Sequence, residues 1–450
     1  KGYFLRCIRK ALFLYLKCIL RKIFFISGKD VRKKFGFYTN TIERLKGMKK
    51  IISCILTVLM LFMCTSSPVW AEEVQSDVTG ENKKTVIGVS VYNLDDAEVR
   101  AFRNYFENYA GVSFEAEFLY SSSINTAEEE IDFINELHKR NVKGIISFLS
   151  SDLEEVLPVC KEYGMYYVRG SGTISDEMYE KVKDNPYFLG TIGPSVETEM
   201  EAAAKMTEYF ASDDQNKQNH YIIACGGTGT GNEMHRLRTI SMLNRLQEIY
   251  GLSYDKPVEQ LADAKDIEQI ETGSDIKITL APGYPSRDKL DKKLADLINT
   301  GEYNVVLSVL GANGFINVID DYEEENDTDV LLGVIDCFTE DTYELFNTRG
   351  YAGTERLNYL VGKYGAIVAP SFVSMENALA GFSEDYRDDG NAFQLNQSFW
   401  VADSEESFNK QYALSVGMYD NTYSVEDMMK VMKFYTPETD FEEFRNFTEK

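Results

Sequence analysis

The sequence predicts an α/β protein of two Rossmann-like lobes, each built on a parallel β-sheet and joined by a hinge that the chain crosses several times. Short apolar runs rich in β-branched and aromatic residues alternate with helical segments of about ten to twenty residues, which is typical of βαβ units. The alternation begins near residue 84 and starts again after "YFLGTIGPS" (187–195). In each half a strand–helix–strand unit ends in a charged residue, Arg169 in the first half and Asp336 in the second.

The first half contains clear signals for helix ends. In "TAEEEIDFINELHKR" (126–140) a threonine that can cap a helix is followed by acidic residues in the first turn. The segment "DLEEVLPVCKEYG" (152–164) ends in a glycine, which suits a helix C-terminus. We expect strands at 85–92, 114–121, 142–150 and 165–170, and helices at 95–110, 126–140 and 152–164.

The second half repeats this architecture with different residues. We expect helices at 196–211, 232–250, 286–300 and 314–325, and strands at 221–225, 276–282, 305–311 and 330–336. Ligands of open parallel α/β sheets bind beyond the carboxyl ends of the strands. Two such sheets therefore predict a ligand cleft between the lobes, and hinge closure is the usual way to bury the ligand there.

Residues 48–71, "MKKIISCILTVLMLFMCTSSPVWA", have the features of a signal peptide. Two lysines precede an apolar run that is too short to span a membrane comfortably, and Val-Trp-Ala predicts cleavage after Ala71. Lipoprotein processing at Cys64 is the alternative. We interpret residues 1–47 as upstream sequence in front of a start at Met48, with a membrane-associated basic helix as the alternative.

Charge is divided unevenly along the chain. Residues 1–71 carry 15 Lys and Arg against 2 Asp and Glu, whereas the remainder carries 32 against 70 and has a net charge of −38. Phosphate contacts need clustered basic residues, so an acidic body of this kind argues against nucleic acid and anionic membranes as partners. It favours a neutral or cationic ligand.

Three cysteines follow the expected cleavage point, Cys160, Cys225 and Cys337, and all lie in apolar contexts. They show neither a CxxC pair nor the spacing of a metal site. We expect buried free thiols, with a bridge between Cys225 and Cys337 as the alternative.

The sequence resembles the type I periplasmic binding proteins, the group of ribose- and galactose-binding proteins that serve sugar ABC transporters. The resemblance covers about residues 84–402 and rests on "TVIGVSVYNLDDAEVRAF", "ELHKRNVKGIISFLSSDLEEVLPVCKEYGMYYVRGSG", "GGTGTGNEMHRLRTISMLNRL", "VLLGVID" and "AIVAPSFVSMENALAGF". It implies an N-terminal lobe of 84–195 plus 371–397 and a C-terminal lobe of 196–370 plus 398–402. The linker 72–83 precedes these lobes, and a helical extension, 403–450, follows. Within this extension, "SVEDMMKVMKFY" (424–435) is expected to form an amphipathic helix with a serine cap that packs on one lobe.

The resemblance also implies ligand contacts. Arginine and aspartate at the positions of Arg236 and Asp336 hydrogen-bond sugar hydroxyls in the family, and charged planar groups do this better than neutral ones. Departures from the family pattern are the absence of an aromatic pair after the first strand, Gly311-Ala312 in place of Asn-Asp, and Pro370 at a hinge glutamine position. The candidate ligand-binding residues are Asn93, Asp95, Arg169, Ser171, Arg236, Asn313 and Asp336.

The same sequence supports a nucleotide site, a calcium site or a catalytic site less well. The loop "GGTGTGN" (226–232) offers neither GxGxxG nor the lysine of a phosphate-binding loop, so its glycines indicate a sharp turn rather than a nucleotide site. The acidic run 320–329 lacks the glycine of a calcium-binding loop and is expected to be a solvated helix end. We find no nucleophile–base pair and no metal cluster, and therefore expect no enzyme activity, no cofactor and no bound metal.

The function implied is that of an exported monomer, outside the cytoplasm, that captures a small polar ligand such as a sugar or polyol by cleft closure. It would deliver this ligand to the permease of an ABC transporter. The alternative is an extracytoplasmic sensor of the same fold that docks on a membrane receptor.

Overall fold

The structure of the protein is a computed structural model, and it describes residues 84–170, 172–212, 218–226, 233–351 and 353–449. The chain divides into two units, 1–81 and 82–450, and the described residues all belong to the second. The predicted signal peptide, Cys64, the linker, Ser171 and most of the glycine loop lie outside the described residues.

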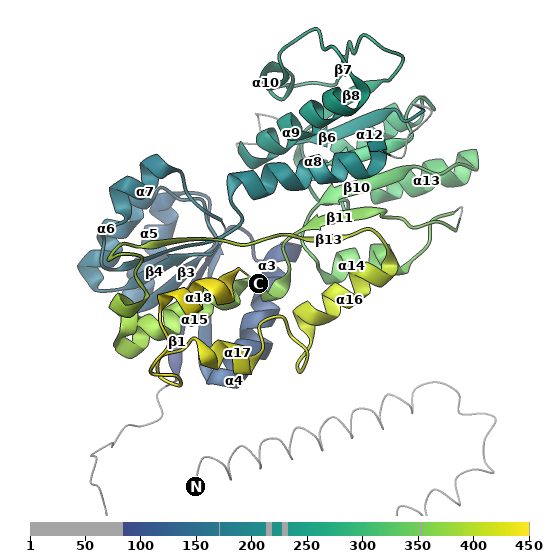
Figure 1. Cartoon of the computed structure of the whole chain (residues 1–450). Helices are drawn as coiled ribbons and strands as arrows, with labels where there is room; N and C mark the ends of the chain where they lie inside the picture. Colours follow the sequence, from purple (N-terminus) through teal and green to yellow (C-terminus); the bar gives the residue numbers. More distant parts are fainter. Residues whose placement is uncertain (1–83, 171, 213–217, 227–232, 352, 450) are drawn as a thin grey trace, which may run out of the picture. The chain divides into compact units, whose positions relative to one another are not determined.

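The first sheet, of which β1, β3 and β4 are labelled in Figure 1, has six strands, all parallel, in the order β12-β5-β4-β3-β1-β2. The predicted helix at 126–140 is confirmed as α5, where Thr126 and Glu129 form a reciprocal cap. The strands are β1 (Thr85–Val91), β2 (Ala116–Ser123), β3 (Gly144–Ser147), β4 (Tyr166–Arg169), β5 (Phe188–Gly193) and β12 (Phe393–Asn396). The helices around it are α3 (Ala97–Tyr105), α4 (Gly111–Phe114), α5 (Ala127–Lys139), α6 (Leu153–Tyr163), α7 (Asp176–Val182) and α15 (Ala369–Asn377).

The second sheet has seven strands in the order β13-β11-β10-β9-β6-β8-β7. Its inner strands are parallel, but β7 and β13 at the edges run antiparallel, which the sequence did not predict. The strands are β6 (Tyr221–Cys225), β7 (Glu268–Ile270), β8 (Ile278–Pro282), β9 (Val305–Ser308), β10 (Leu331–Ile335), β11 (Tyr359–Gly362) and β13 (Trp400–Ala402). The helices are α8 (Val196–Ser212), α9 (Glu233–Tyr250), α10 (Val258–Leu261), α11 (Pro285–Asp288), α12 (Leu290–Ile298), α13 (Ile316–Asn326) and α14 (Glu340–Asn347).

The chain passes between the two sheets three times: after β5, after β11, and between β12 and β13. This arrangement confirms the predicted hinge. Two of the crossings are held together by Tyr364 and Trp400, whose rings stack with centroids 3.5 Å apart. In addition, Gln397 Nε2 donates to the backbone oxygen of Ile367 at 3.0 Å.

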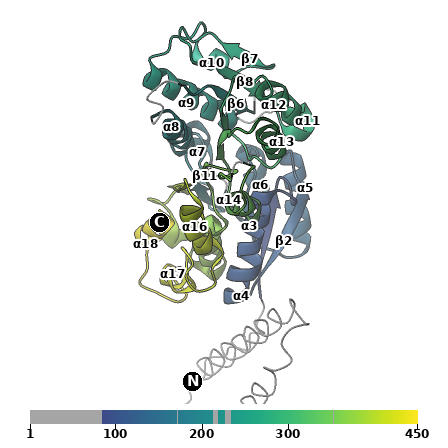
Figure 2. The same cartoon turned by 90° about the vertical axis from the view of Figure 1, so that its right-hand side faces the viewer.

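The C-terminal segment forms α16 (Glu405–Val416), α17 (Val425–Lys430) and α18 (Phe441–Thr448). The helix expected at 424–435 is the shorter α17, which is capped by Ser424 and packs against α15 beside the first sheet, as does α18 (Figures 1 and 2). By contrast, α16 packs against β13 and α14 of the second sheet. The segment reaches both sheets because apolar side chains occur along its whole length. Phe408 is fully buried and stacks on Phe338, and Phe444 is fully buried against Phe393.

Cys160, Cys225 and Cys337 are buried free thiols, as predicted, and the alternative bridge between Cys225 and Cys337 is absent. Among the described helices, none combines the length and the apolar character needed to cross a membrane.

Candidate ligand-binding site

A cavity of about 620 Å³ lies at the carboxyl ends of strands from both sheets. Its size falls in the range of about 300–1,000 Å³ that is usual for small-molecule sites. The first sheet contributes residues that directly follow β1, β2 and β3, and the second sheet contributes residues that directly follow β9, β10 and β11. The lining residues used below are Tyr92, Asp96, Glu98, Phe148, Ser150, Glu199, His235, Arg238, Tyr284, Gly311, Asp336, Gly362, Lys363 and Phe399.

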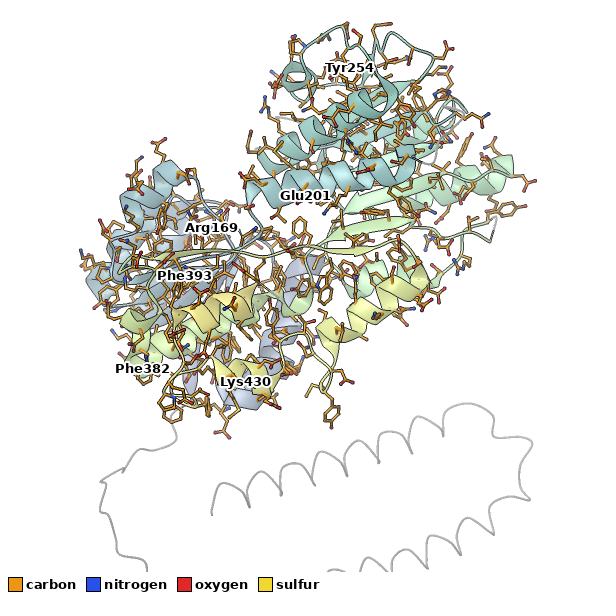
Figure 3. The ribbon with its side chains drawn as sticks, in the orientation of Figure 1. Arg169, Glu201, Tyr254, Phe382, Phe393 and Lys430 are labelled. Carbon is orange, nitrogen blue, oxygen red and sulfur yellow. The ribbon has the colours of Figure 1, made fainter. Side chains whose placement is uncertain are left out.

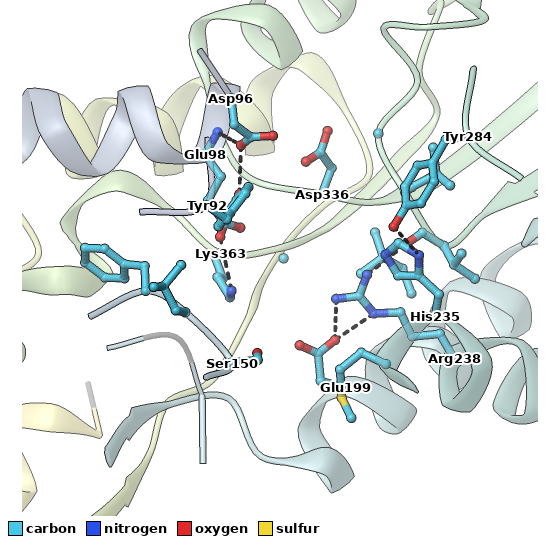
Figure 4. Close-up of a pocket in the computed structure, with 18 of the residues that line it drawn as sticks. Tyr92, Asp96, Glu98, Ser150, Glu199, His235, Arg238, Tyr284, Asp336 and Lys363 are labelled. Atoms are coloured by element: carbon cyan, nitrogen blue, oxygen red, sulfur yellow. Dashed lines mark hydrogen bonds and ion pairs between the residues drawn. The ribbon is translucent and has the colours of Figure 1, made fainter. Parts of the chain in front are cut away.

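The start of α3 forms one wall of the cavity (Figure 4). Asp96 caps this helix, because its Oδ1 accepts the backbone N–H of Glu98 at 2.9 Å, and it also accepts the hydroxyl of Tyr92 at 2.9 Å. Burial and the nearby carboxylates of Glu98 and Asp96 raise the pKa of Tyr92, so this phenol remains a hydrogen-bond donor. Glu98 in turn pairs with Lys363, with 3.2 Å between Oε1 and Nζ.

The pair of Glu98 and Lys363 connects the two halves of the protein, since Glu98 lies on α3 and Lys363 directly follows β11 of the second sheet. Both side chains are largely buried. Burial lowers the pKa of Lys363, but the carboxylates of Glu98 and Glu199 outweigh it, so the net shift is upward. The ammonium group therefore remains charged inside the cavity.

Helices α8 and α9 form the opposite wall. Arg238 donates from Nε to Glu199 Oε2 at 2.7 Å and from Nη1 to the backbone oxygen of Val309 at 2.7 Å. Glu199 is buried and Arg238 nearly so. Beside them, burial lowers the pKa of His235 to about 3, so its ring is neutral, and its Nδ1 lies 3.3 Å from the hydroxyl of Tyr284.

Asp336 follows β10 and extends into the cavity between these walls (Figure 4). Its Oδ1 accepts the backbone N–H of Cys337 at 2.7 Å. A Cβ atom on Gly311 would overlap Asp336 Oδ2, and one on Gly362 would overlap the Asp336 backbone oxygen, so the side chain of Asp336 needs glycine at position 311 and its backbone needs glycine at position 362. Burial raises its pKa to about 7; the Cys337 N–H opposes this shift, and the carboxylates of Glu98 and Asp96 add to it.

Comparison with solved structures identifies this arrangement of two sheets. A periplasmic sugar-binding protein from Pseudomonas fluorescens is similar over 79% of this chain and 96% of its own, with a TM-score of 0.53 and 12% identity. A galactofuranose-binding protein matches over 74% and 99%, at 0.52 and 13%. A solute-binding protein of an ABC transporter from Actinobacillus succinogenes 130z, with bound D-allose, matches over 73% and 100%, at 0.52 and 11%.

This chain has the type I periplasmic binding protein fold. No family model matches the sequence, and a search of curated proteins finds no match. The cavity occupies the position expected for this fold, at the strand ends of both sheets.

Of the residues that the resemblance to type I binding proteins proposes as ligand contacts, Asp336 lines the cavity. Arg169 (Figure 3) does not line the cavity itself but contacts a residue that does. Its Nη2 donates to Oγ of the lining residue Ser150 (Figure 4) at 3.3 Å. Asn93 and Asp95 are exposed in the loop after β1, where Asn93 Oδ1 accepts the Asp95 N–H at 3.1 Å.

Arg236 and Asn313 do not line the cavity. Arg236 faces Asp263, with its Nε 2.6 Å from Oδ1, and Asn313 Nδ2 donates to Asp341 at 3.1 Å. Ser171 lies outside the described residues. Their roles as ligand contacts remain predictions.

The lining arginine is Arg238, two positions beyond the predicted one. An α-helix has 3.6 residues per turn, so these two side chains lie on nearly opposite faces of α9. The sequence "HRLR" contains both arginines, but only the packing of α9 on α8 determines which one faces the cavity. The aromatic side chains of the cavity come from several segments: Tyr92 directly follows β1, and Phe148, Tyr284 and Phe399 come from elsewhere in the chain.

Among the residues that the structure describes, no group of three His, Cys, Asp or Glu side chains is placed to hold a metal ion. The cavity instead combines paired charges, phenol groups and aromatic faces. Such an arrangement can hydrogen-bond a polar ligand and contact its apolar faces.

Proposed function

We propose that this protein is an exported solute-binding protein that captures a small, hydroxyl-rich ligand, a sugar or polyol, and delivers it to the permease of an ABC transporter. The observation that carries the proposal is the cavity of about 620 Å³ at the strand ends of both sheets, lined by charged and aromatic side chains. Solved proteins of similar fold are described as sugar-binding, which supports this choice of ligand class.

The cavity offers both kinds of hydrogen-bonding partner that a polyol needs. Carboxylates accept hydrogen bonds, and Arg238 and Lys363 can donate them, while the Tyr92 hydroxyl oxygen, whose proton is donated to Asp96, can accept one. Hydrogen bonds to charged groups contribute about 1.5–3 kcal/mol each, roughly twice as much as neutral ones. The rings of Phe148 and Phe399 would contact the C–H faces of a sugar.

Ligand capture would bring the two sheets together around the hinge, and the Glu98–Lys363 pair lies where the two halves meet. In this proposal the protein has no catalytic role, works outside the cytoplasm after cleavage near Ala71, and acts as a monomer. The ligand-loaded form would be the one that the permease recognises.

The test is a thermal-shift screen of residues 72–450 against sugars, polyols, nucleosides and amino acids. A ligand that binds only the folded protein stabilises it by about 2.7 kcal/mol at a free concentration of about 100 times its Kd. We expect a sugar or polyol to raise the Tm, and Arg238→Met to weaken this effect. If no solute raises the Tm, or if nucleosides or amino acids alone do so, the proposal is wrong.

A further inference from the structure

The cavity contains more acidic than basic groups. Among the described residues, six charged side chains line it: the acids Asp96, Glu98, Glu199 and Asp336, and the bases Arg238 and Lys363. Glu98 pairs with Lys363, and Glu199 pairs with Arg238. Both cations are therefore neutralised by protein carboxylates, which leaves two further carboxylates.

The protein stabilises the negative charges of these two carboxylates, Asp96 and Asp336, to different extents. Asp96 accepts two hydrogen bonds through Oδ1 and lies at the N-terminus of α3, where the helix dipole favours a negative charge. Asp336 Oδ1 accepts one hydrogen bond, from the Cys337 N–H. Within the described part of the chain, no ion pair is formed by Asp336, and its Oδ2 lies against Gly311 at the cavity.

We infer that the ligand of the proposed binding function carries a positively charged amine in addition to its hydroxyl groups, and that Asp336 binds this amine. The inference rests on the proposed function and specifies the ligand class within it: an amino sugar or an amine-bearing polyol. The cavity volume of about 620 Å³ accommodates a molecule of this size.

Electrostatics favours a cation over an anion or a neutral solute. The groups that face Asp336 are Asp96 and Glu98 from α3, Arg238 from α9, and Lys363 after β11. An anion would meet the unpaired carboxylate of Asp336 and would have to displace a protein carboxylate from each base. A neutral polyol can donate hydroxyl hydrogen bonds to Asp336, but only a cationic ligand also supplies a counter-charge for the buried carboxylate.

The raised pKa of Asp336 agrees with this geometry, because burial and the nearby carboxylates of Glu98 and Asp96 disfavour its charged form. An ammonium group placed at Oδ2 would restore that charged form. Neutral His235 adds no positive charge to the opposite wall.

The experiment is isothermal titration calorimetry of residues 72–450 at neutral pH with galactosamine, glucosamine and mannosamine, each beside its neutral parent sugar and its N-acetyl derivative. We expect at least one amino sugar to bind more tightly than both neutral counterparts. Asp336→Asn should reduce that amino sugar's affinity by about 30-fold or more, the usual result of removing one partner of a buried charge pair. The same variant should weaken binding of the neutral parent by a smaller factor, because the asparagine oxygen still accepts a hydrogen bond from a hydroxyl group.

Asp132→Asn, an exposed aspartate on α5, is the matched control and should leave every affinity unchanged. Circular dichroism and retained binding of the neutral parent show that Asp336→Asn is folded. If the neutral sugars bind as tightly as the amino sugars, or if Asp336→Asn affects both equally, the inference is overturned while the proposed function stands. If no amino sugar binds, the inference is overturned, and if the thermal-shift screen also finds no sugar or polyol that binds, the proposed function is wrong as well.

Discussion

Replacing Asp336 by asparagine should make the free energy of unfolding of the ligand-free protein depend less on pH. Burial, opposed by the Cys337 N–H and assisted by Glu98 and Asp96, raises the pKa of Asp336 from 3.8 to about 7 in the folded protein. A carboxyl whose pKa is raised by folding stabilises the protein fully below its unfolded pKa, and this contribution is lost as the pH rises through the folded pKa. With these two values, linkage gives a loss of about 2–3 kcal/mol in the free energy of unfolding between pH 5 and pH 8.

The assay is urea denaturation of the wild type, Asp336→Asn and the control Asp132→Asn at pH 5, 6, 7 and 8. The wild type and the control should lose stability along parallel curves, and Asp336→Asn should lose about 2–3 kcal/mol less over the same interval. Glu323 and Glu376, whose pKa values burial also raises to about 7, remain in all three proteins and give the residual slope. Parallel curves for Asp336→Asn and the wild type would refute the reasoning, because Asp336 would then be charged at neutral pH like an exposed aspartate.

Three further substitutions test the packing around the cavity and in the C-terminal segment. Gly311→Ala places a methyl group where the carboxylate of Asp336 lies, and should cost about 1–3 kcal/mol in the free energy of unfolding and weaken ligand binding in calorimetry. Lys363→Met leaves Glu98 largely buried without its partner, and should cost about 3 kcal/mol by urea denaturation. Phe408→Ala removes a fully buried ring of α16 and leaves a cavity in the core, and should lower the free energy of unfolding by about 3–5 kcal/mol in the same measurement.

Two of these substitutions have a control variant, and the third has a stated outcome that would contradict it. Adding Glu98→Gln to Lys363→Met should recover much of the lost stability, and no recovery would mean that the ion pair is not the cause. Tyr419→Ala removes an aromatic ring that is 89% exposed and should change stability by less than about 0.5 kcal/mol. A similar loss for Tyr419→Ala and Phe408→Ala would contradict the core position of Phe408. Full ligand affinity in Gly311→Ala would show that the carboxylate of Asp336 can move without consequence.

Apolar runs in the sequence were sufficient to predict the inner strands β1, β6, β8, β9 and β10. The strand expected at 221–225 is β6 with the same bounds, and the one expected at 330–336 is β10, Leu331–Ile335. A short, continuously apolar run in a doubly wound fold is buried on both faces, so its local signal is strong. The short strands β11, β12 and β13 were not predicted, because segments of three or four residues show little periodicity and depend on their neighbours in the sheet.

The sequence likewise predicted some residues of the candidate site and missed others. Asp336 could be placed from the sequence, because a carboxylate directly after an apolar strand of a parallel sheet lies at the edge where ligands bind. Lys363 could not be placed in this way, since it follows an unpredicted strand and its partner Glu98 is 265 positions away. Arg238 was passed over for Arg236 because both arginines occupy the same helix, and tertiary packing decides which of them faces the cavity.

The C-terminal segment should make the described unit unfold as one cooperative block. In a protein whose lobes were joined by the crossings alone, each lobe could melt separately. Here Ser415 Oγ accepts the backbone N–H of Ala366 beside the hinge at 3.2 Å, while Phe408 and Phe444 are buried beside different sheets. Loss of either sheet would expose part of the same three-helix segment and withdraw support from the other sheet, which merges two melting transitions into a single one.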